Sequence, residues 1–456
     1  MQFSVFAYLQ YRKKTTKEGK TENIDMKKTW GQYIAAAGAG IFLAAAAGYQ
    51  KLPVRAAGEE TDSSAGTVQN PVVLNYWIWD DEEYYISKIV DAFEMTHPGI
   101  EIELHIMENY IYDDKIKDVV KSEEPVDLLG IRGVTKIVDY QEEGLLLELN
   151  DYLARSPLDT TAYGNMFGTY AIDDRYYGLP TRCTCWVLYY NKEIFDAEGV
   201  AYPGQMTWEE YARLAKQLTN NGTGDDKIWG GYFADWCYQF AGVQRKNYLY
   251  DDDIADTLEG LQLLNRFYNV DKSHPPLSAV METSDEYLQF FEDGNVAMMP
   301  QGEWVAGLIM EDVRNGRKTA DWDIAPMPVF EGQDPYSTWG QYQFAGITSE
   351  CEHPQEAFEF LSWLCGEGGA QIIAGSGNIS GYMDDEIREI YRDSLQGKNV
   401  DVFFKSQRVL ESPPRPEYNE ILAEFTDIAE EYLLQNITFE EARAKLEAKR
   451  QELYAR

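Results

Sequence analysis

The spacing of hydrophobic residues changes twice between residues 72 and 106. Residues 72–79 form a nearly continuous apolar run, which predicts a buried strand. Apolar side chains then recur at helical spacing from Tyr85 to Phe93, and the helix that they predict must end before Gly99, which follows a proline. Between residues 100 and 106 every second position is apolar, as in a strand with one buried face.

A further helix at about 112–122 and an apolar run at 126–129 complete a βαβαβ pattern. This pattern predicts an α/β fold with a mostly parallel, layered sheet. Ligands of such sheets bind at the carboxyl ends of the strands, which fall here at 77–81, 108–110 and 130–133.

Later elements carry clear start signals. Thr207 and Glu210 stand three residues apart, as in a capping box. Asn191 is expected to cap the helix after it, and Asp80 or Asp81 the first helix. Further helices are expected at about 251–269, at 284–293 and from 353 onward, and strands at 322–328 and 341–348.

The first 57 residues have the features of a targeting segment. Two lysines precede an apolar run, 34–47, that is shorter than the roughly 20 residues of a membrane-spanning helix. The basic stretch, the short apolar run and the small residues after it predict a secretory signal at 1–57, with Met26 as a possible true start. A flexible linker at 58–70 follows, and no lipid-attachment cysteine stands near the predicted cleavage site.

Charge narrows the range of partners. The net charge is −37, and residues 1–57 hold nine Lys or Arg and three Asp or Glu, so the remainder carries −37 − 6 = −43. Such an excess disfavours nucleic acid and anionic lipid as partners, and it favours a neutral or cationic ligand over a polyanion. An acidic surface also keeps a secreted protein soluble, which is the simpler explanation.

Length and composition argue for two lobes without a metal or other cofactor. The residues after the linker exceed what one hydrophobic core normally serves. Five cysteines are too few and too sparse for a disulfide framework, and the four histidines lack metal-ligand spacing. No nucleophile elbow, phosphate loop or zinc-protease motif is present, so an enzyme is not expected. A glycosidase-type carboxylate pair remains open among 77 acidic residues.

The most informative segment runs from Phe290 to Trp304. It combines a helix end, a turn at Gly294, a short apolar strand and a loop that carries Trp304. A flat ring just past a strand end can stack on a ligand, although such a tryptophan also serves in core packing. The segment resembles a pattern found in the carbohydrate-type (maltose-binding-like) extracellular solute-binding proteins, the sugar-binding subunits of bacterial ABC importers. The residues that match are Phe291, Gly294, Ala297, Met298, Gly302 and Trp304.

The resemblance covers most of the chain after the linker, in outline only at 110–170 and 220–285, where ligand identity is usually determined. The more specific matches are 74–79, 93–102, 177–180, 188–195, 207–210, 324–328, 345–348 and 357–361.

The resemblance implies a periplasmic-binding-protein-like fold, in which two lobes, each a mostly parallel sheet flanked by helices, enclose a ligand cleft. It further implies an exported monomer, periplasmic or at the cell surface, that binds a carbohydrate, which we expect to be an oligosaccharide, and delivers it to the permease subunits of an ABC importer. The implied segments are 71–187 plus 347–400 for lobe one, 190–343 plus 405–456 for lobe two, and crossovers near 186–190 and 344–347.

Sugar recognition combines aromatic faces with planar hydrogen-bonding groups. The resemblance places Trp304 in the cleft, and Trp79 ends the first strand. Glu303 is expected either to accept from a ligand hydroxyl or to cap a helix, and Trp186 to serve either hinge packing or the cleft. The candidate ligand-binding residues are Trp304, Trp79, Asp80, Trp236, Asp235, Glu303, Trp339, Tyr342, Arg132 and Arg182.

Three alternatives remain at this level. A binding protein could serve a membrane sensor or take a non-sugar solute, and a secreted enzyme could act on glycosides. The signal could also stay uncleaved as a membrane anchor.

Overall fold

The computed structural model describes residues 71–282, 287–413, 415 and 417–454; the predicted signal, the Met26 start and the linker lie outside them. No helix in the described part is long and apolar enough to cross a membrane. The strands are β1 (Val72–Trp79), β2 (Ile100–Met107), β3 (Leu128–Arg132), β4 (Leu179–Cys183), β5 (Trp186–Asn191), β6 (Met298–Gly302), β7 (Trp322–Ala325), β8 (Ser337–Gly340), β9 (Tyr342–Ile347) and β10 (Gln407–Leu410).

Helices alternate with the strands in the first half of the chain and dominate its end. The α-helices are α3 (Glu83–Thr96), α4 (Asn109–Val120), α5 (Val134–Glu142), α6 (Asn150–Leu153), α7 (Lys192–Glu198), α8 (Trp208–Leu218), α9 (Phe240–Gln244), α10 (Ala255–Asn265), α11 (Leu277–Glu282), α12 (Tyr287–Glu292), α13 (Trp304–Arg314), α14 (Pro354–Cys365), α15 (Glu367–Gly375), α16 (Asp385–Ser394), α17 (Asp401–Lys405), α18 (Glu417–Leu433) and α19 (Phe439–Tyr454). Shorter turns are η1 (Asp80–Glu82), η2 (Thr160–Tyr170), η3 (Gly224–Asp226) and η4 (Arg266–Val270).

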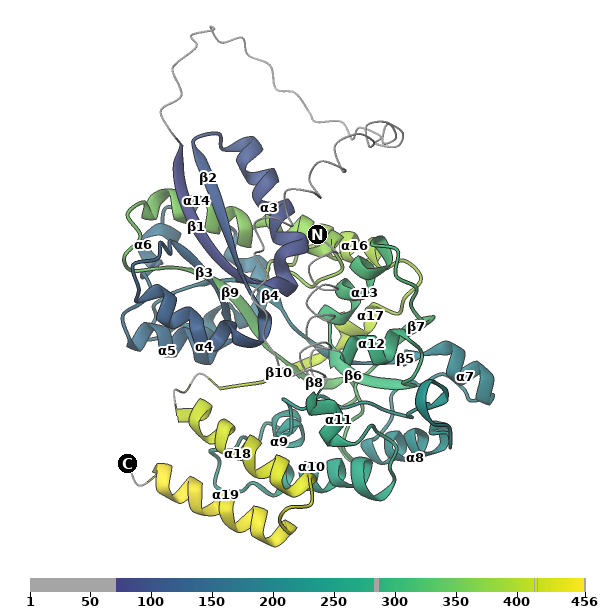
Figure 1. Ribbon diagram of the computed structural model, residues 1–456. Helices are drawn as coiled ribbons and strands as arrows, with labels where there is room; N and C mark the ends of the chain where they lie inside the picture. Colours follow the sequence, from purple (N-terminus) through teal and green to yellow (C-terminus); the bar gives the residue numbers. More distant parts are fainter. Residues whose placement is uncertain (1–70, 283–286, 414, 416, 455–456) are drawn as a thin grey trace, which may run out of the picture. The chain divides into compact units, whose positions relative to one another are not determined.

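The larger sheet has the order β2-β1-β3-β9-β4, with helices on both faces (Figure 1). β1 is parallel to β2 and β3, as predicted, whereas β9 runs antiparallel to β3 and β4. Leu74, Tyr76 and Ile78 alternate onto one face of β1 and share a buried cluster with α3 and α14. α4 and α5 contribute to the cluster on the opposite face.

The smaller sheet departs from the expectation of parallel strands. Its order is β6-β5-β7, and β5 runs antiparallel to both neighbours. β5 continues directly from β4 of the larger sheet, so it enters the smaller sheet against the direction of β6 and β7. The expected strand-free C-terminal part also contains a strand, β10, which pairs in parallel with β8.

Two predicted helix starts are confirmed and one is wrong. Thr207 and Glu210 form a capping box, and the Asn191 side chain accepts from the first turn of α7. Neither Asp80 nor Asp81 caps a helix, because both lie inside η1. The Asp80 carboxylate accepts instead from the backbone N–H of Asn109, at 2.9 Å.

The chain leaves the larger sheet at Thr184, between β4 and β5 of the smaller sheet, and returns to it at Gln341, between β9 and β8, which forms a third, two-stranded sheet with β10. These points precede the expected crossovers, which fall inside β5 and β9. The two crossing segments are joined to each other: Thr184 N donates to the Gln341 carbonyl at 2.7 Å, and Gln341 N donates to Thr184 Oγ1 at 2.8 Å. Gly340 permits this approach, because a Cβ there would lie 2.1 Å from the Thr184 carbonyl oxygen.

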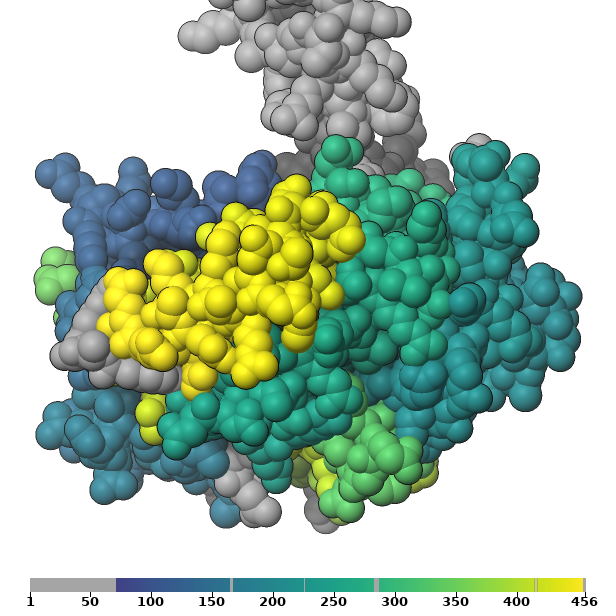
Figure 2. Space-filling model, turned by 90° about the horizontal axis from the view of Figure 1, so that it is seen from below, coloured from purple at the N-terminus to yellow at the C-terminus, as the bar shows by residue number. Residues whose placement is uncertain are grey.

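The C-terminal helices α18 and α19 pack against each other, and α18 also packs against α10 (Figure 1). In the space-filling view from below they lie across the exposed face as one yellow ridge (Figure 2). Arg450 of α19 is held there by the carbonyl of Leu249, to which its Nε donates at 2.8 Å.

Candidate functional site

A cavity of about 540 Å³ lies where the carboxyl end of the larger sheet meets the crossing segments and the start of α13. We call it the main cavity. Its walls combine aromatic rings with carboxylate, amide and guanidinium groups. The lining residues are Trp79, Asp81, Tyr84, Asn109, Tyr110, Asp113, Asp114, Arg132, Arg182, Thr184, Asp235, Trp236, Tyr287, Trp304, Leu308, Gln341, Gln343 and Asn378.

Trp304 begins α13 directly after β6, and its ring folds back over Gly302. A Cβ at Gly302 would lie 1.8 Å from the ring, so only glycine fits there. The indole nitrogen donates to the Tyr287 hydroxyl at 2.9 Å, and the ring packs edge-on against Trp186 at 5.7 Å. These contacts fix the orientation of the ring, which lines the cavity.

Trp79 also lines the cavity, but one face of its ring is already covered. The Arg132 guanidinium carbon lies 4.2 Å from the ring centroid, and Trp79 is only 3% exposed. A Cβ at Gly130 would lie 2.8 Å from the same ring, so glycine is needed there as well. Trp79 therefore supports Arg132 and leaves little of its own surface to a ligand.

Arg132 has both a fixed position and an unused donor. Nη1 donates to the Asn109 carbonyl at 3.2 Å and lies 3.6 Å from the Asp113 carboxylate. Nη2 is buried and has no hydrogen-bond partner among the described residues. The stacking on Trp79 and the Nη1 contacts orient this donor, which a ligand oxygen can satisfy.

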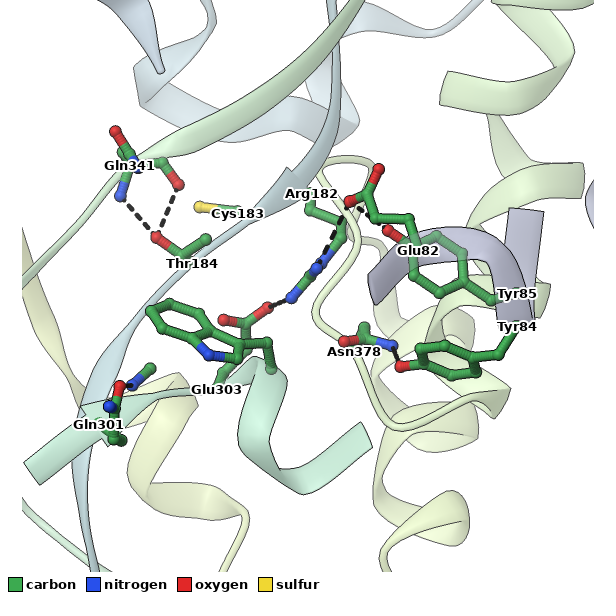
Figure 3. Close-up of polar contacts among 12 residues, drawn as sticks. Glu82, Tyr84, Tyr85, Arg182, Cys183, Thr184, Gln301, Glu303, Gln341 and Asn378 are labelled. Atoms are coloured by element: carbon green, nitrogen blue, oxygen red, sulfur yellow. Dashed lines mark hydrogen bonds and ion pairs between the residues drawn. The ribbon is translucent and has the colours of Figure 1, made fainter. Parts of the chain in front are cut away.

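Arg182 lies between two carboxylates that come from different parts of the chain (Figure 3). Nη1 is 3.5 Å from Glu82 of η1, and Nη2 forms a short ion pair with Glu303, which follows β6. The Tyr85 hydroxyl donates to the Glu82 carboxylate. This buried group of charges therefore connects the larger sheet to the start of α13.

Burial and neighbouring charges shift the pKa values of Glu82, Glu303 and Arg182. Burial raises the pKa of Glu82 and of Glu303, against the opposing effect of the Arg182 charge. Burial alone would lower the pKa of Arg182, but the Glu303 carboxylate and the other acidic neighbours raise it well above its ordinary value. Arg182 therefore stays positively charged. The carboxylates of Glu82 and Glu303 offset this buried charge.

Two exposed aromatic residues stand at the open side of the main cavity. Tyr110 of α4 is 67% exposed, and Trp236, in the turn before α9, is 38% exposed. Trp236 packs edge-on against Tyr287, which in turn holds Trp304. We call Tyr110 and Trp236 the cavity mouth.

Six of the predicted binding residues line the main cavity, namely Trp304, Trp79, Trp236, Asp235, Arg132 and Arg182. The other four do not, because other contacts hold them. Asp80 faces the start of α4, and the Glu303 carboxylate pairs with Arg182. Trp339 is buried against Trp186 at 5.2 Å, and Tyr342 donates to the Tyr163 carbonyl at 3.0 Å. Trp186 is likewise a packing residue, buried between Trp339 and Trp304.

Sequence reasoning missed the polar residues that α4 and the crossing segments bring to the cavity. Asp113 and Asp114 lie in a region that matches the family only in outline, and Asn109 directly precedes it; all three follow the carboxyl end of β2, where ligand groups are expected. Gln341 and Gln343 flank the second crossing, where sequence reasoning favoured the neighbouring aromatic residues. Asn378 follows α15 and had no signal in the sequence.

No group of metal-binding side chains occurs among the described residues, and all five cysteines are free thiols. The rings, carboxylates, amides and guanidinium groups that line the main cavity are of the kinds that recognise hydroxyls and rings.

A family model for bacterial extracellular solute-binding proteins matches residues 79–371 of this chain. The chain belongs to that family. The resemblance noted from the sequence is thereby confirmed, and the family is one of binding proteins rather than enzymes. An arabinooligosaccharide-binding protein of Halalkalibacterium halodurans is 29% identical to this solute-binding protein over 48% of this chain. That match spans 49% of the relative, about half of its length.

Solved structures of solute-binding proteins establish the fold. A sugar transporter from Rhizobium etli, in an open conformation, superposes with a TM-score of 0.70 at 22% identity, over 83% of this chain and 99% of that one. An ABC substrate-binding protein from Listeria monocytogenes, in complex with cycloalternan, gives a TM-score of 0.72 at 20% identity, over 84% and 98%. The predicted two-lobed, periplasmic-binding-protein-like α/β fold is confirmed.

Proposed function

We propose that this protein binds an oligosaccharide in the main cavity and delivers it, as a monomer, to the permease subunits of an ABC importer. Family membership supports a binding role, and the name of the Halalkalibacterium relative supports an oligosaccharide as ligand. We further propose that it does so outside the cytoplasm, after export by the signal at 1–57.

The observation that carries the proposal is the pairing of an oriented aromatic ring with unsatisfied polar groups in one cavity. The Trp304 ring is held by Tyr287 and lines the cavity, where it can stack on the C–H face of a sugar. Arg132 Nη2 offers a donor a short way along the wall, and the amides of Gln341 and Gln343 offer both donors and acceptors. Such a combination suits a polyhydroxylated ring better than an apolar or a strongly charged solute.

Delivery follows from closure of the two lobes around the ligand. We assign the chain from β1 to β4, together with β9, to lobe one, and the chain from β5 to β8 to lobe two. Trp79, Arg132 and Tyr110 then belong to lobe one, and Trp304 and Trp236 to lobe two, so one saccharide contacts both. The ligand favours the closed form only to the extent that it binds that form more tightly than the open one.

The proposal is tested by thermal-shift screening of the purified protein against mono- and oligosaccharides, amino acids and polyamines. A ligand that binds only the folded state raises the melting temperature as its concentration exceeds its dissociation constant. We expect a shift with one group of saccharides, confirmed by calorimetry, and an unchanged saccharide on chromatography afterwards. Shifts with non-sugars only would overturn the sugar assignment, and release of shorter sugars would replace binding by glycoside hydrolysis.

Export is tested separately by mass spectrometry of the protein from its native cells. We expect a mature form that begins after the signal. A membrane-bound form that retains residues 34–47 would show that the signal serves as an anchor instead.

A further inference from the structure

The innermost part of the main cavity holds two buried polar side chains with unused hydrogen-bonding capacity. Asn378 is 1% exposed; its amide nitrogen donates to the Tyr84 hydroxyl, and its Oδ1 has no partner among the described residues. Arg182 is 3% exposed; its terminal nitrogens meet Glu303 and Glu82, and its Nε has no partner among the described residues. We call Arg182 and Asn378 the cavity floor.

The floor offers one donor and one acceptor to the same ligand. Figure 3 shows the Asn378 oxygen pointing away from Tyr84, on the side of Glu303 and the Arg182 guanidinium. Buried polar groups are nearly always hydrogen-bonded, so two unused ones in a cavity wall point to a ligand that satisfies both. A hydroxyl group accepts from Nε and donates to Oδ1, and neighbouring hydroxyls of one sugar ring can divide these roles.

The position of Asn378 is built into the packing around it. A Cβ at Gly307 of α13 would lie within 3.0 Å of the Asn378 Oδ1 and Nδ2 atoms and 2.5 Å from the Tyr84 hydroxyl. Gly377 has a φ of +85°, and a Cβ there would lie 2.6 Å from the Met310 sulfur. Two glycines thus let the loop after α15 place the Asn378 amide directly against α13.

The cavity mouth has the opposite character. Tyr110 and Trp236 expose large ring surfaces, and both line the same cavity from different sides of the site. Single exposed aromatic residues are common on protein surfaces, but a pair at the open side of one cavity provides platforms for further rings. A volume of about 540 Å³ also falls within the range of about 300–1,000 Å³ that is typical of pockets for drug-sized ligands.

We propose that the oligosaccharide binds end-on, with its terminal ring at Arg182 and Asn378 and its later rings leaving between Tyr110 and Trp236. This inference rests on the proposed sugar-binding function. In this arrangement the cavity floor recognises one end of the oligosaccharide, and the cavity mouth makes affinity depend on the number of sugar units.

The test is calorimetry with arabino-, malto- and manno-oligosaccharides of one to four units. In the series that binds, we expect affinity to rise with the second or third unit and then to level off. Trp236→Ala and Tyr110→Ala should weaken the longer oligomers by roughly three- to tenfold each, as expected for a lost stacking contact, and should weaken the monosaccharide less. Asn378→Ala should weaken every length alike.

A second measurement decides orientation without any variant. A trisaccharide of the binding series is capped with a bulky group at the reducing end or at the other end, and both forms are titrated. End-on binding requires that one form binds as the parent does and that the other fails. Tolerance of both caps or rejection of both would overturn the proposal.

The matched control is Tyr202→Ala, because Tyr202 is 43% exposed but does not line the main cavity. It should change no affinity. Equal weakening of mono- and oligosaccharides by Trp236→Ala would overturn the length assignment while the sugar-binding function stands. Absence of binding by every saccharide would overturn both.

Discussion

The guanidinium carbon of Arg132 lies 4.2 Å from the centroid of the Trp79 ring, so that a cation occupies a ring face that would otherwise be open to a ligand. The stack orients the arginine, and the buried Nη2 is left as the group that a ligand can reach. We therefore propose that Trp79 acts on a ligand through Arg132.

We expect Arg132→Lys to weaken saccharide binding nearly as much as Arg132→Ala does, by about 1.5–3 kcal/mol, because lysine keeps the charge but cannot stack and donate from a fixed plane. Calorimetry with the best saccharide measures the difference. Arg155→Ala, an arginine outside the cavity lining, serves as control. Wild-type affinity in Arg132→Lys would show that only the charge matters.

Trp304→Ala should weaken binding by more than about 1 kcal/mol, and Trp304→Phe by less, because a phenyl ring retains part of the stacking surface. Tyr287→Phe should also weaken binding, since it removes the hydroxyl that orients the indole. Calorimetry of the three variants tests this order. If Trp304→Ala binds as tightly as the wild type, Trp304 is a packing residue.

Glu303→Ala should destabilise the fold by about 3–5 kcal/mol, because it leaves the buried Arg182 with only the more distant Glu82 carboxylate. Urea denaturation measures the loss. The matched control is Glu311→Ala, which removes a partly exposed carboxylate of the same helix region and should cost far less. If both variants lost the same unfolding free energy, the buried charge of Arg182 would not be the reason that Glu303 stabilises the fold.

Acidic saccharides should bind more weakly than their neutral counterparts. Four aspartates line the main cavity against two arginines, and Arg182 already faces two carboxylates. We expect a uronic-acid oligomer to lose affinity relative to the neutral oligomer of the same linkage, and the gap to shrink at high salt or in Asp114→Asn. Tighter binding of the uronate would contradict this charge argument. The lining residues that carry charge are Asp81, Asp113, Asp114, Asp235, Arg132 and Arg182.

Stability should depend on pH through Glu411, which follows β10. Burial raises its pKa from 4.5 to about 7, so the folded state holds a proton that the unfolded state has already lost. Its contribution to stability is full below pH 4.5, falls as the pH rises through about 7, and is then constant. The melting temperature of Glu411→Gln should therefore fall less than that of the wild type between pH 5 and pH 8. Parallel curves would contradict the raised pKa.

The sequence predicts well where local chemistry determines the result. The first strand, the capping box at Thr207 and the turn at Gly294 follow from hydrophobic period, side-chain hydrogen bonds a few residues apart and the freedom of glycine to adopt a positive φ. Trp304, expected on a loop, instead begins α13. The prediction for Asp80 is wrong, because its carboxylate accepts a hydrogen bond from the backbone N–H of Asn109, a residue distant in the sequence. Competition of that kind is visible only in three dimensions.

The cavity residues also divide into those that local sequence can indicate and those that depend on distant contacts. An aromatic residue near a strand end is a reasonable binding candidate, and Trp304 and Trp339 look alike by that criterion. Gly302 turns the Trp304 ring into the cavity wall, whereas Trp339 is buried by Trp186 and Phe240. Asn378 could not be found from the sequence, because its role depends on a loop that two glycines press against α13.

The hydrogen bonds between Thr184 and Gln341 tie the two crossing segments into one ribbon. If either crossing were independent, one sheet could slide or twist against the other in several ways. A paired ribbon leaves bending about a single line as the soft motion. Points on such a line hardly move while points far from it travel furthest, so Thr184 and Gln341 can meet the ligand early and keep hold of it while Tyr110 and Trp236 approach it last.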